Sequence, residues 1–188
     1  MKIKPRQIAL AGILLAVSAV LLNTPLGMIP VPTPARYATI MHIPIIIIGI
    51  LEGPLLGGLA GLLFGCLAFL KVPEFGPVVH ILPRPLIGIL SALAYSGTMK
   101  LIKKPRLETL GISLAAVTGS VINTFGVVLL AVWLVPKLMP RVVAYSIIIS
   151  AGIPEAVLAI LFTVPLALAI KSRFPRYTRK IVNIKTGE

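Results

Sequence analysis

A few polar side chains stand within otherwise apolar stretches of this chain, and their types suit the binding of a small solute. Arg84 lies between two prolines, and Asn123 lies inside a long apolar run. An arginine can hold a carboxylate through two parallel hydrogen bonds, and an asparagine both donates and accepts. Since a polar group inside a bilayer needs a partner, both residues are candidates for a ligand site. The alternatives are that Arg84 marks the headgroup level and that Asn123 bonds a neighbouring helix.

Three further candidates come at or after the end of a proline-rich stretch, residues 25–34. Arg36 closes this stretch, and Thr39 and His42 follow shortly. Arg36 could bind an anionic group or mark the headgroup level, while Thr39 and His42 could form hydrogen bonds to a ligand. Because proline fixes φ and removes a donor, we expect the stretch itself to be an extended cap.

Glu155 completes the set of candidate ligand-binding residues. It follows Pro154 directly, a position that suits an acidic residue in the first turn of a helix. Glu155 could therefore meet a hydroxyl or amine of a ligand, cap the helix, or pair with Arg84. The two histidines, His42 and His80, lack the companions that a metal site requires, so we expect no bound metal.

Membrane helices must position these residues. The chain has 188 residues, a hydrophobic fraction of 57% and a mean hydropathy of +1.04, more than a soluble domain needs for its core. We predict an all-α membrane protein, a six-transmembrane-helix bundle that forms one integral membrane substrate-binding domain over residues 1–188. Its spans are expected at about residues 7–28, 38–51, 55–70, 84–100, 109–135 and 152–172.

The start of the last span allows two interpretations. Residues 142–170 could form one tilted helix, but Gly152-Ile153-Pro154 lies within them. Proline favours the first turn of a helix over its interior. We therefore predict that the last span begins near Pro154 and that residues 137–150 form an apolar outer loop or a short interfacial helix.

The net charge of +13 is distributed unevenly among the loops. Thirteen of the eighteen lysines and arginines fall at the two termini and in the loop after the fourth span. Cytoplasmic loops retain lysine and arginine near helix ends, so both termini are expected in the cytoplasm. Residues 173–188 would form a basic cytoplasmic tail near membrane lipid, and no nucleic-acid partner is expected.

Small residues recur four positions apart in several spans, a pattern that allows helices to approach closely in lipid. We expect three such rows to pack inside the bundle: Gly57, Gly61 and Gly65; Gly88, Ala92 and Ser96; and Gly111, Ala115 and Gly119. Gly12 and Ala16 form a smaller pair in the first span, with Ala9 nearby. That pair either packs internally or offers a docking face to another membrane subunit.

Several chemistries lack their usual signatures. The sequence has no Walker motif, no string of carboxylates inside the spans, and no nucleophile–base or metal-ligand set. We therefore expect a receptor that does not power its own transport and is not an enzyme. A self-sufficient secondary transporter of a small solute is the alternative.

Five short motifs, taken in order, resemble the substrate-binding S component of energy-coupling factor (ECF) transporters. They are Ala38-Thr39-Ile40-Met41-His42-Ile43-Pro44, Glu52-Gly53-Pro54, Leu82-Pro83-Arg84, Val121-Ile122-Asn123-Thr124 and Gly152-Ile153-Pro154-Glu155-Ala156. The resemblance covers about residues 8–172. Where the family often shows A-x-x-x-A in its first helix, this chain has Gly12-x-x-x-Ala16.

This resemblance implies a multi-pass protein of the cell membrane that captures a vitamin from outside with high affinity. Its partners would be a transmembrane T component and two cytoplasmic ATPases, which use the ATP, so no cofactor of its own is expected. The similarity favours the pantothenate branch, with folate or another micronutrient as the alternative. Arg84 would pair with a carboxylate, Asn123 and Thr39 would orient polar groups, and Glu155 would meet a hydroxyl or amine.

Overall fold

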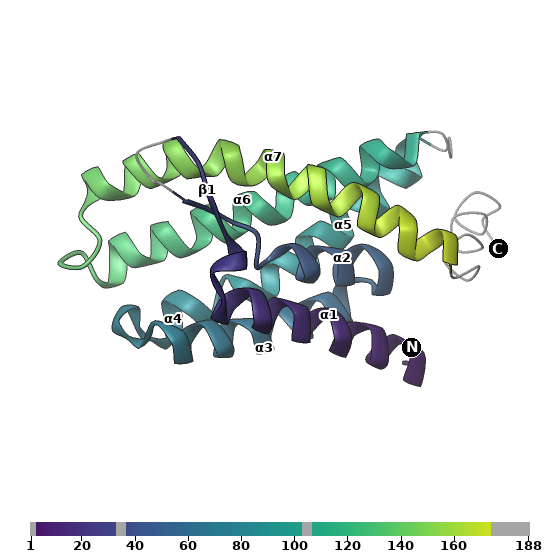
Figure 1. The fold of residues 1–188 in the computed structure, drawn as a ribbon, viewed down its shortest axis with the longest axis horizontal. Helices are drawn as coiled ribbons and strands as arrows, with labels where there is room; N and C mark the ends of the chain where they lie inside the picture. The colour runs from purple at the N-terminus through teal and green to yellow at the C-terminus, as the bar shows by residue number, and fades with distance from the viewer. Residues whose placement is uncertain (1–2, 33–36, 103–106, 174–188) are drawn as a thin grey trace.

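The computed structural model describes residues 3–32, 37–102 and 107–173. Within these residues five helices are long and apolar enough to cross a membrane. The third of these apolar stretches runs from Pro73 to Ile102, so it also includes the short segment before its long helix. They run roughly along the long axis of the molecule (Figure 1). These helices are α1 (Pro5–Asn23), α3 (Pro54–Lys71), α5 (Arg84–Ile102), α6 (Glu108–Leu134) and α7 (Arg141–Arg173).

The predicted spans at residues 55–70, 84–100 and 109–135 therefore match helices closely. The predicted first span, residues 7–28, is too long, because α1 ends at Asn23. The chain then forms the turn η1 (Pro25–Gly27) and the strands β1 (Met28–Pro30) and β2 (Tyr37–Thr39). The strands pair antiparallel, with Met28 opposite Thr39. The expectation that the proline-rich stretch is extended is confirmed for β1 and is wrong for Pro25–Gly27, which form a 3-10 turn.

The helix α2 (Ile43–Glu52) is short and central. All ten of its residues are buried, which explains a run of isoleucines with no polar face. At helical rise it is about 15 Å long, half the thickness of a hydrocarbon core. The second predicted span, residues 38–51, is thus a strand end followed by a buried short helix.

The row of Gly57, Gly61 and Gly65 packs inside the bundle as predicted. A Cβ added at Gly57 would lie 2.8 Å from Gly49 Cα, and one at Gly61 would lie 2.2 Å from the Arg84 carbonyl oxygen. On the other side of α3, leucines such as Leu55 and Leu63 are exposed. Only glycine allows this approach, which fixes the start of α5 against α3.

The prediction that the last span begins near Pro154 is wrong. α7 is one helix of 33 residues that contains Pro154 and Pro165 and includes most of the expected loop, residues 137–150. Its length is about 50 Å at helical rise. Proline is tolerated within membrane helices because neighbouring groups satisfy the freed carbonyls. Packing against α6 therefore outweighs the local preference for a break.

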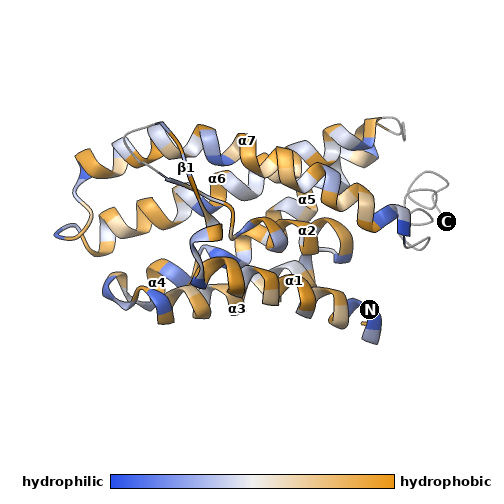
Figure 2. Ribbon diagram, viewed as in Figure 1, coloured by the Kyte–Doolittle hydropathy of each residue, from blue (hydrophilic) through white to orange (hydrophobic). Residues whose placement is uncertain are grey.

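The expected outer loop, residues 71–83, contains the turn η2 (Pro73–Phe75) and the short helix α4 (Gly76–Ile81). At the opposite end of the bundle lie the start of α1 and the end of α7 (Figure 1). We call this the basic end, because Lys4 and Arg6 lie at the start of α1 and Lys171 and Arg173 in the last turn of α7. Figure 2 shows hydrophilic colour at both of these helix ends. The outward surfaces of the helices between the two ends are largely apolar, as a lipid-facing surface should be.

Candidate functional site

A cavity of about 290 Å³ lies in the half of the bundle opposite the basic end. Every long helix contributes to its wall. Both strands, Met41 just after β2, and α4 also contribute. Most of the lining is apolar, including Leu22, Met28, Met41 and Val128. A concave, mostly apolar pocket with a few convergent polar groups is the usual form of a small-molecule site.

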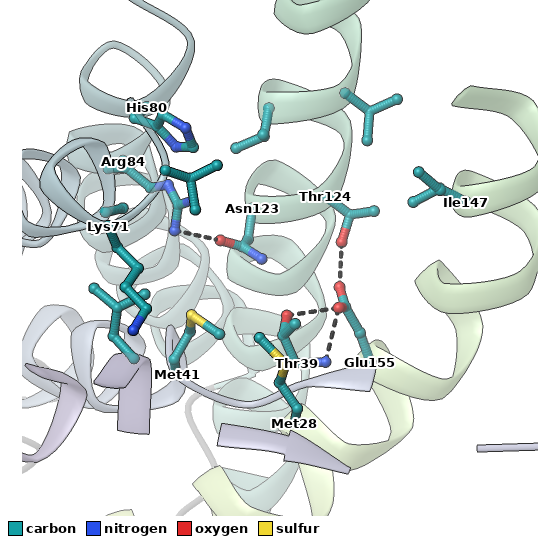
Figure 3. Close-up of a pocket in the computed structure, with 15 residues that line it drawn as sticks. Met28, Thr39, Met41, Lys71, His80, Arg84, Asn123, Thr124, Ile147 and Glu155 are labelled. Carbon is teal, nitrogen blue, oxygen red and sulfur yellow. Dashed lines mark hydrogen bonds between the residues drawn. The ribbon is translucent and has the colours of Figure 1, made fainter. Parts of the chain in front are cut away.

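Arg84 and Asn123 meet at this cavity (Figure 3). Arg84, the first residue of α5, is only 7% exposed, and its Nη1 donates to Asn123 Oδ1 at 3.1 Å. The guanidinium carbon lies 4.8 Å from the centroid of the Phe64 ring, and Nε has no hydrogen-bond partner among the described residues. Arg84 and Asn123 were both predicted to bind the ligand, and the structure brings them into contact. A buried guanidinium that faces an amide and an aromatic ring retains donors for an anion.

Glu155 lies on the other side of the cavity, where three donors converge on it (Figure 3). Oε1 accepts from the Thr39 backbone N–H at 2.9 Å and from Thr39 Oγ1 at 2.6 Å. Oε2 accepts from the hydroxyl of Thr124. The described residues show no ion pair between Glu155 and Arg84. Thr39 and Glu155 therefore bond each other, and a direct role of either in ligand binding stays a prediction.

Two other predicted residues contribute less to the geometry. His42 is completely buried at the start of α2 and does not line the cavity. Neither of its ring nitrogens has a hydrogen-bond partner within the described part of the chain. Arg36 falls outside the described residues. Of the six predicted ligand-binding residues, four line the cavity: Thr39, Arg84, Asn123 and Glu155.

A family model described as "ECF transporter, substrate-specific component" matches residues 6–167. The chain belongs to this family. It is therefore a substrate-specific membrane component of an ECF transporter, that is, an S component. No curated protein and no solved structure shows a significant match to the chain.

Three further polar residues of this S component line the cavity and were not predicted: Lys71, His80 and Thr124. Lys71 ends α3 and His80 lies in α4, so both flank the expected outer loop. Thr124 directly follows Asn123 in the motif Val121-Ile122-Asn123-Thr124, and this position could have identified it as a candidate for the site. Lys71 could have been suspected because it is one of five basic residues outside the termini and the basic loop.

The small residues of α1 face away from the bundle of the S component. Ala9, Gly12 and Ala16 are all exposed, and a Cβ added at Gly12 would meet no atom within 4 Å. Internal packing therefore does not account for Gly12-x-x-x-Ala16. The face is free to approach another helix closely, as small residues permit in membranes.

Proposed function

We propose that this S component binds a small carboxylate-bearing vitamin, with pantothenate favoured, and presents it for import. The observation that carries this proposal is the buried guanidinium of Arg84 at the cavity wall. It donates to Asn123, and its Nε has no partner among the described residues. A carboxylate is the natural partner, because it accepts two parallel hydrogen bonds from an arginine and neutralises its charge.

The size of the cavity favours a small ligand. Its volume of about 290 Å³ lies at the lower end of the range for ligand pockets, roughly 300–1,000 Å³. Pantothenate suits such a space better than folate, which is larger. The apolar stretch with Met28 and Met41 would contact the uncharged body of the ligand, since methionine adapts to irregular shapes.

Identification of the bound molecule tests this proposal most directly. The full chain would be purified from its membrane, and the small molecules that co-purify with it would be identified by mass spectrometry. Calorimetric titration with pantothenate, folate and thiamine would then compare an acid, a larger acid and a cation. We expect tight binding of pantothenate alone. Tight binding of thiamine would contradict the role given to Arg84, and tight binding of folate would move the protein to the alternative branch.

We further propose that a T component docks on the outward face of α1 formed by Ala9, Gly12 and Ala16. Both termini would be cytoplasmic, and two ATPases bound to the T component would supply the energy. The support is the exposed small-residue face together with the concentration of basic residues where α1 begins and α7 ends.

Bulky substitution on this face should separate docking from binding. The double variant Gly12→Val, Ala16→Val should retain ligand binding but lose co-purification with the T component, because the added side chains keep the helices apart. Gly97→Val on α5 is a matched control, since a Cβ there also meets nothing within 4 Å. Equal loss of docking in both variants would place the coupling face elsewhere.

A further inference from the structure

A second cavity opens between α6 and α7, and we call it the α6–α7 groove. Its volume is about 390 Å³, and its described lining comprises three residues of α6 and seven of α7. Ile149 and Ile153, two of these residues, are each 70% exposed, so the groove opens on the lipid-facing surface. Among the described residues, it shares only Thr124 with the cavity beside Arg84. The groove is therefore a separate feature of the molecule.

The lining of the α6–α7 groove suits an apolar occupant. A Cβ added at Gly152 would meet no atom within 4 Å, so the space over this part of α7 is open. Among the described lining residues, Thr124 has the one polar side chain. Its hydroxyl bonds Glu155 and the Ser120 carbonyl oxygen of its own helix. The lining thus leaves no polar side-chain group free for a polar solute.

The length of the groove matches one leaflet of a bilayer. Along α7 its lining extends from Ile148 to Ile160, which is about 18 Å at helical rise. The hydrocarbon core of a bilayer is about 30 Å thick, so one leaflet contributes about 15 Å. A single acyl chain could therefore lie between the two helices along most of its length.

Two basic residues lie near one end of the groove. Arg141 begins α7 about 10 Å before Ile148 at helical rise, and Lys137 lies in the turn between α6 and α7. Figure 2 shows hydrophilic colour at this turn. Both residues are exposed, and neither forms an ion pair with another described residue. The sequence has no acidic residue between Glu108 and Glu155, so an anionic group here would meet two cations without a nearby acid in the chain.

Aromatic residues indicate the depth of these two cations in the membrane. Trp133 and Tyr145 lie on either side of the turn and are 85% and 64% exposed. Exposed tryptophan and tyrosine gather where the bilayer meets water. Lys137 and Arg141 are therefore expected at the level of the lipid headgroups. An arginine can hold a phosphate through two parallel hydrogen bonds.

We propose that the α6–α7 groove, together with Lys137 and Arg141, is a binding site for one anionic phospholipid. An acyl chain lies in the groove along α7, and the phosphate pairs with the two basic side chains. The lipid belongs to the leaflet at the end of the bundle opposite the basic end. A zwitterionic phospholipid has the same chains but also carries a positive headgroup charge, so it binds this site more weakly. The site does not depend on which vitamin the protein binds.

Quenching of a tryptophan in the groove tests this site. The chain has one tryptophan, so Trp133→Phe with Phe125→Trp leaves a single tryptophan, at a groove position that is 38% exposed. This probe protein, as the full chain, would be placed in phosphatidylcholine vesicles. Phosphatidylglycerol or phosphatidylcholine with brominated chains, which quench tryptophan on contact, would then replace a rising fraction of the lipid. We expect phosphatidylglycerol to reach half-maximal quenching at an about tenfold lower fraction, because two cations attract it.

Removal of the two charges separates specific binding from ordinary contact with the bilayer. In the probe protein, Lys137→Gln with Arg141→Gln should make the two brominated lipids quench equally. Lys100→Gln with Arg173→Gln is the matched control, since both of these basic residues are exposed and lie in the last turns of α5 and α7. The control should keep the preference for phosphatidylglycerol. A preference that survives the first pair of substitutions, or is lost equally in the control, would overturn the proposal.

Filling the groove tests the place of the acyl chain. Gly152→Leu puts a side chain into the open space, so the preference should fall severalfold. Gly97→Leu on α5 is the control, because a Cβ there also meets no atom within 4 Å, and it should change nothing. An unchanged preference in Gly152→Leu would place the lipid elsewhere. Quenching of the groove tryptophan by neither lipid would mean that a protein segment covers the groove, and the proposal would be wrong.

Salt gives a further test that needs no groove variant and still decides if Gly152→Leu does not fold. Raising the salt concentration from about 0.1 M to about 1 M shortens the Debye length from about 10 Å to about 3 Å. The preference of the probe protein for phosphatidylglycerol should then fall severalfold, while quenching by brominated phosphatidylcholine stays the same. A preference that does not change with salt would contradict the pairing of the phosphate with Lys137 and Arg141.

Discussion

Both ends of this S component bury charged side chains, but among the described residues only one end pairs them with each other. Near the basic end, Glu108 forms an ion pair with Lys171 and accepts from Tyr95 at 2.9 Å. At the cavity, Arg84 contacts an amide and an aromatic ring. The nearby carboxylate, Glu155, takes its three hydrogen bonds from neutral groups.

The difference indicates what each buried charge is for. A buried ion pair satisfies itself and fixes the helices that carry it. A buried cation without a carboxylate partner retains affinity for an anion that comes from outside the chain. The comparison therefore assigns the ion pair to the fold and supports the proposal that the arginine binds the ligand.

The largest effect should come from Arg84→Ala. Loss of the guanidinium removes the group proposed to pair with the ligand carboxylate, at a cost of about 2–5 kcal/mol, or roughly thirtyfold to several thousandfold in Kd. Calorimetric titration with pantothenate measures this change. Arg141→Ala, at an exposed arginine that begins α7, is the control and should bind as the parent does. Undiminished affinity in Arg84→Ala would remove this residue from the site.

A smaller effect on stability should follow from Lys171→Met. The substitution leaves the Glu108 carboxylate without its ion-pair partner, and breaking a buried pair costs about 3 kcal/mol. Because Glu108 is 16% exposed, water relieves part of this, and we expect a loss of about 1–2 kcal/mol. The melting temperature in detergent should fall by several degrees while the Kd for pantothenate stays unchanged. A shift in Kd as large as that of Arg84→Ala would contradict the division of roles.

The smallest effect should come from Gln7→Ala. The Gln7 side-chain amide donates to Glu52 at 2.7 Å and joins α1 to α2. A hydrogen bond to a charged group contributes about 1.5–3 kcal/mol when buried, and this one is only partly buried, so we expect a loss of about 1 kcal/mol. Thermal unfolding measures it, with Asn23→Ala as a control because, among the described residues, that side chain bonds only Ala19 of its own helix. Equal losses in both variants would mean that the α1–α2 contact adds nothing specific.

Much of the fold was predictable because it depends on local composition. The apolar runs that form α3, α5 and α6 can be recognised from the sequence alone, since a lipid environment requires helices whose backbone groups are hydrogen-bonded internally. The row of Gly57, Gly61 and Gly65 likewise predicted a packed face, because the four-residue spacing puts them on one side of a helix. The polar residues Arg84 and Asn123 were conspicuous for a related reason, as each interrupts an apolar run.

The remaining features depend on which segments meet. The sequence by itself determined the membrane class, the apolar helices, the family resemblance and a short set of polar candidates, because these follow from residue types and their spacing. Only the tertiary structure decided that α7 continues through Pro154, that α2 is buried on every side, and that Glu155 bonds Thr39 and Thr124. The reason is physical: a proline break competes with packing along α6, and a carboxylate bonds whichever donors the fold brings to it, even one from a residue 116 positions away.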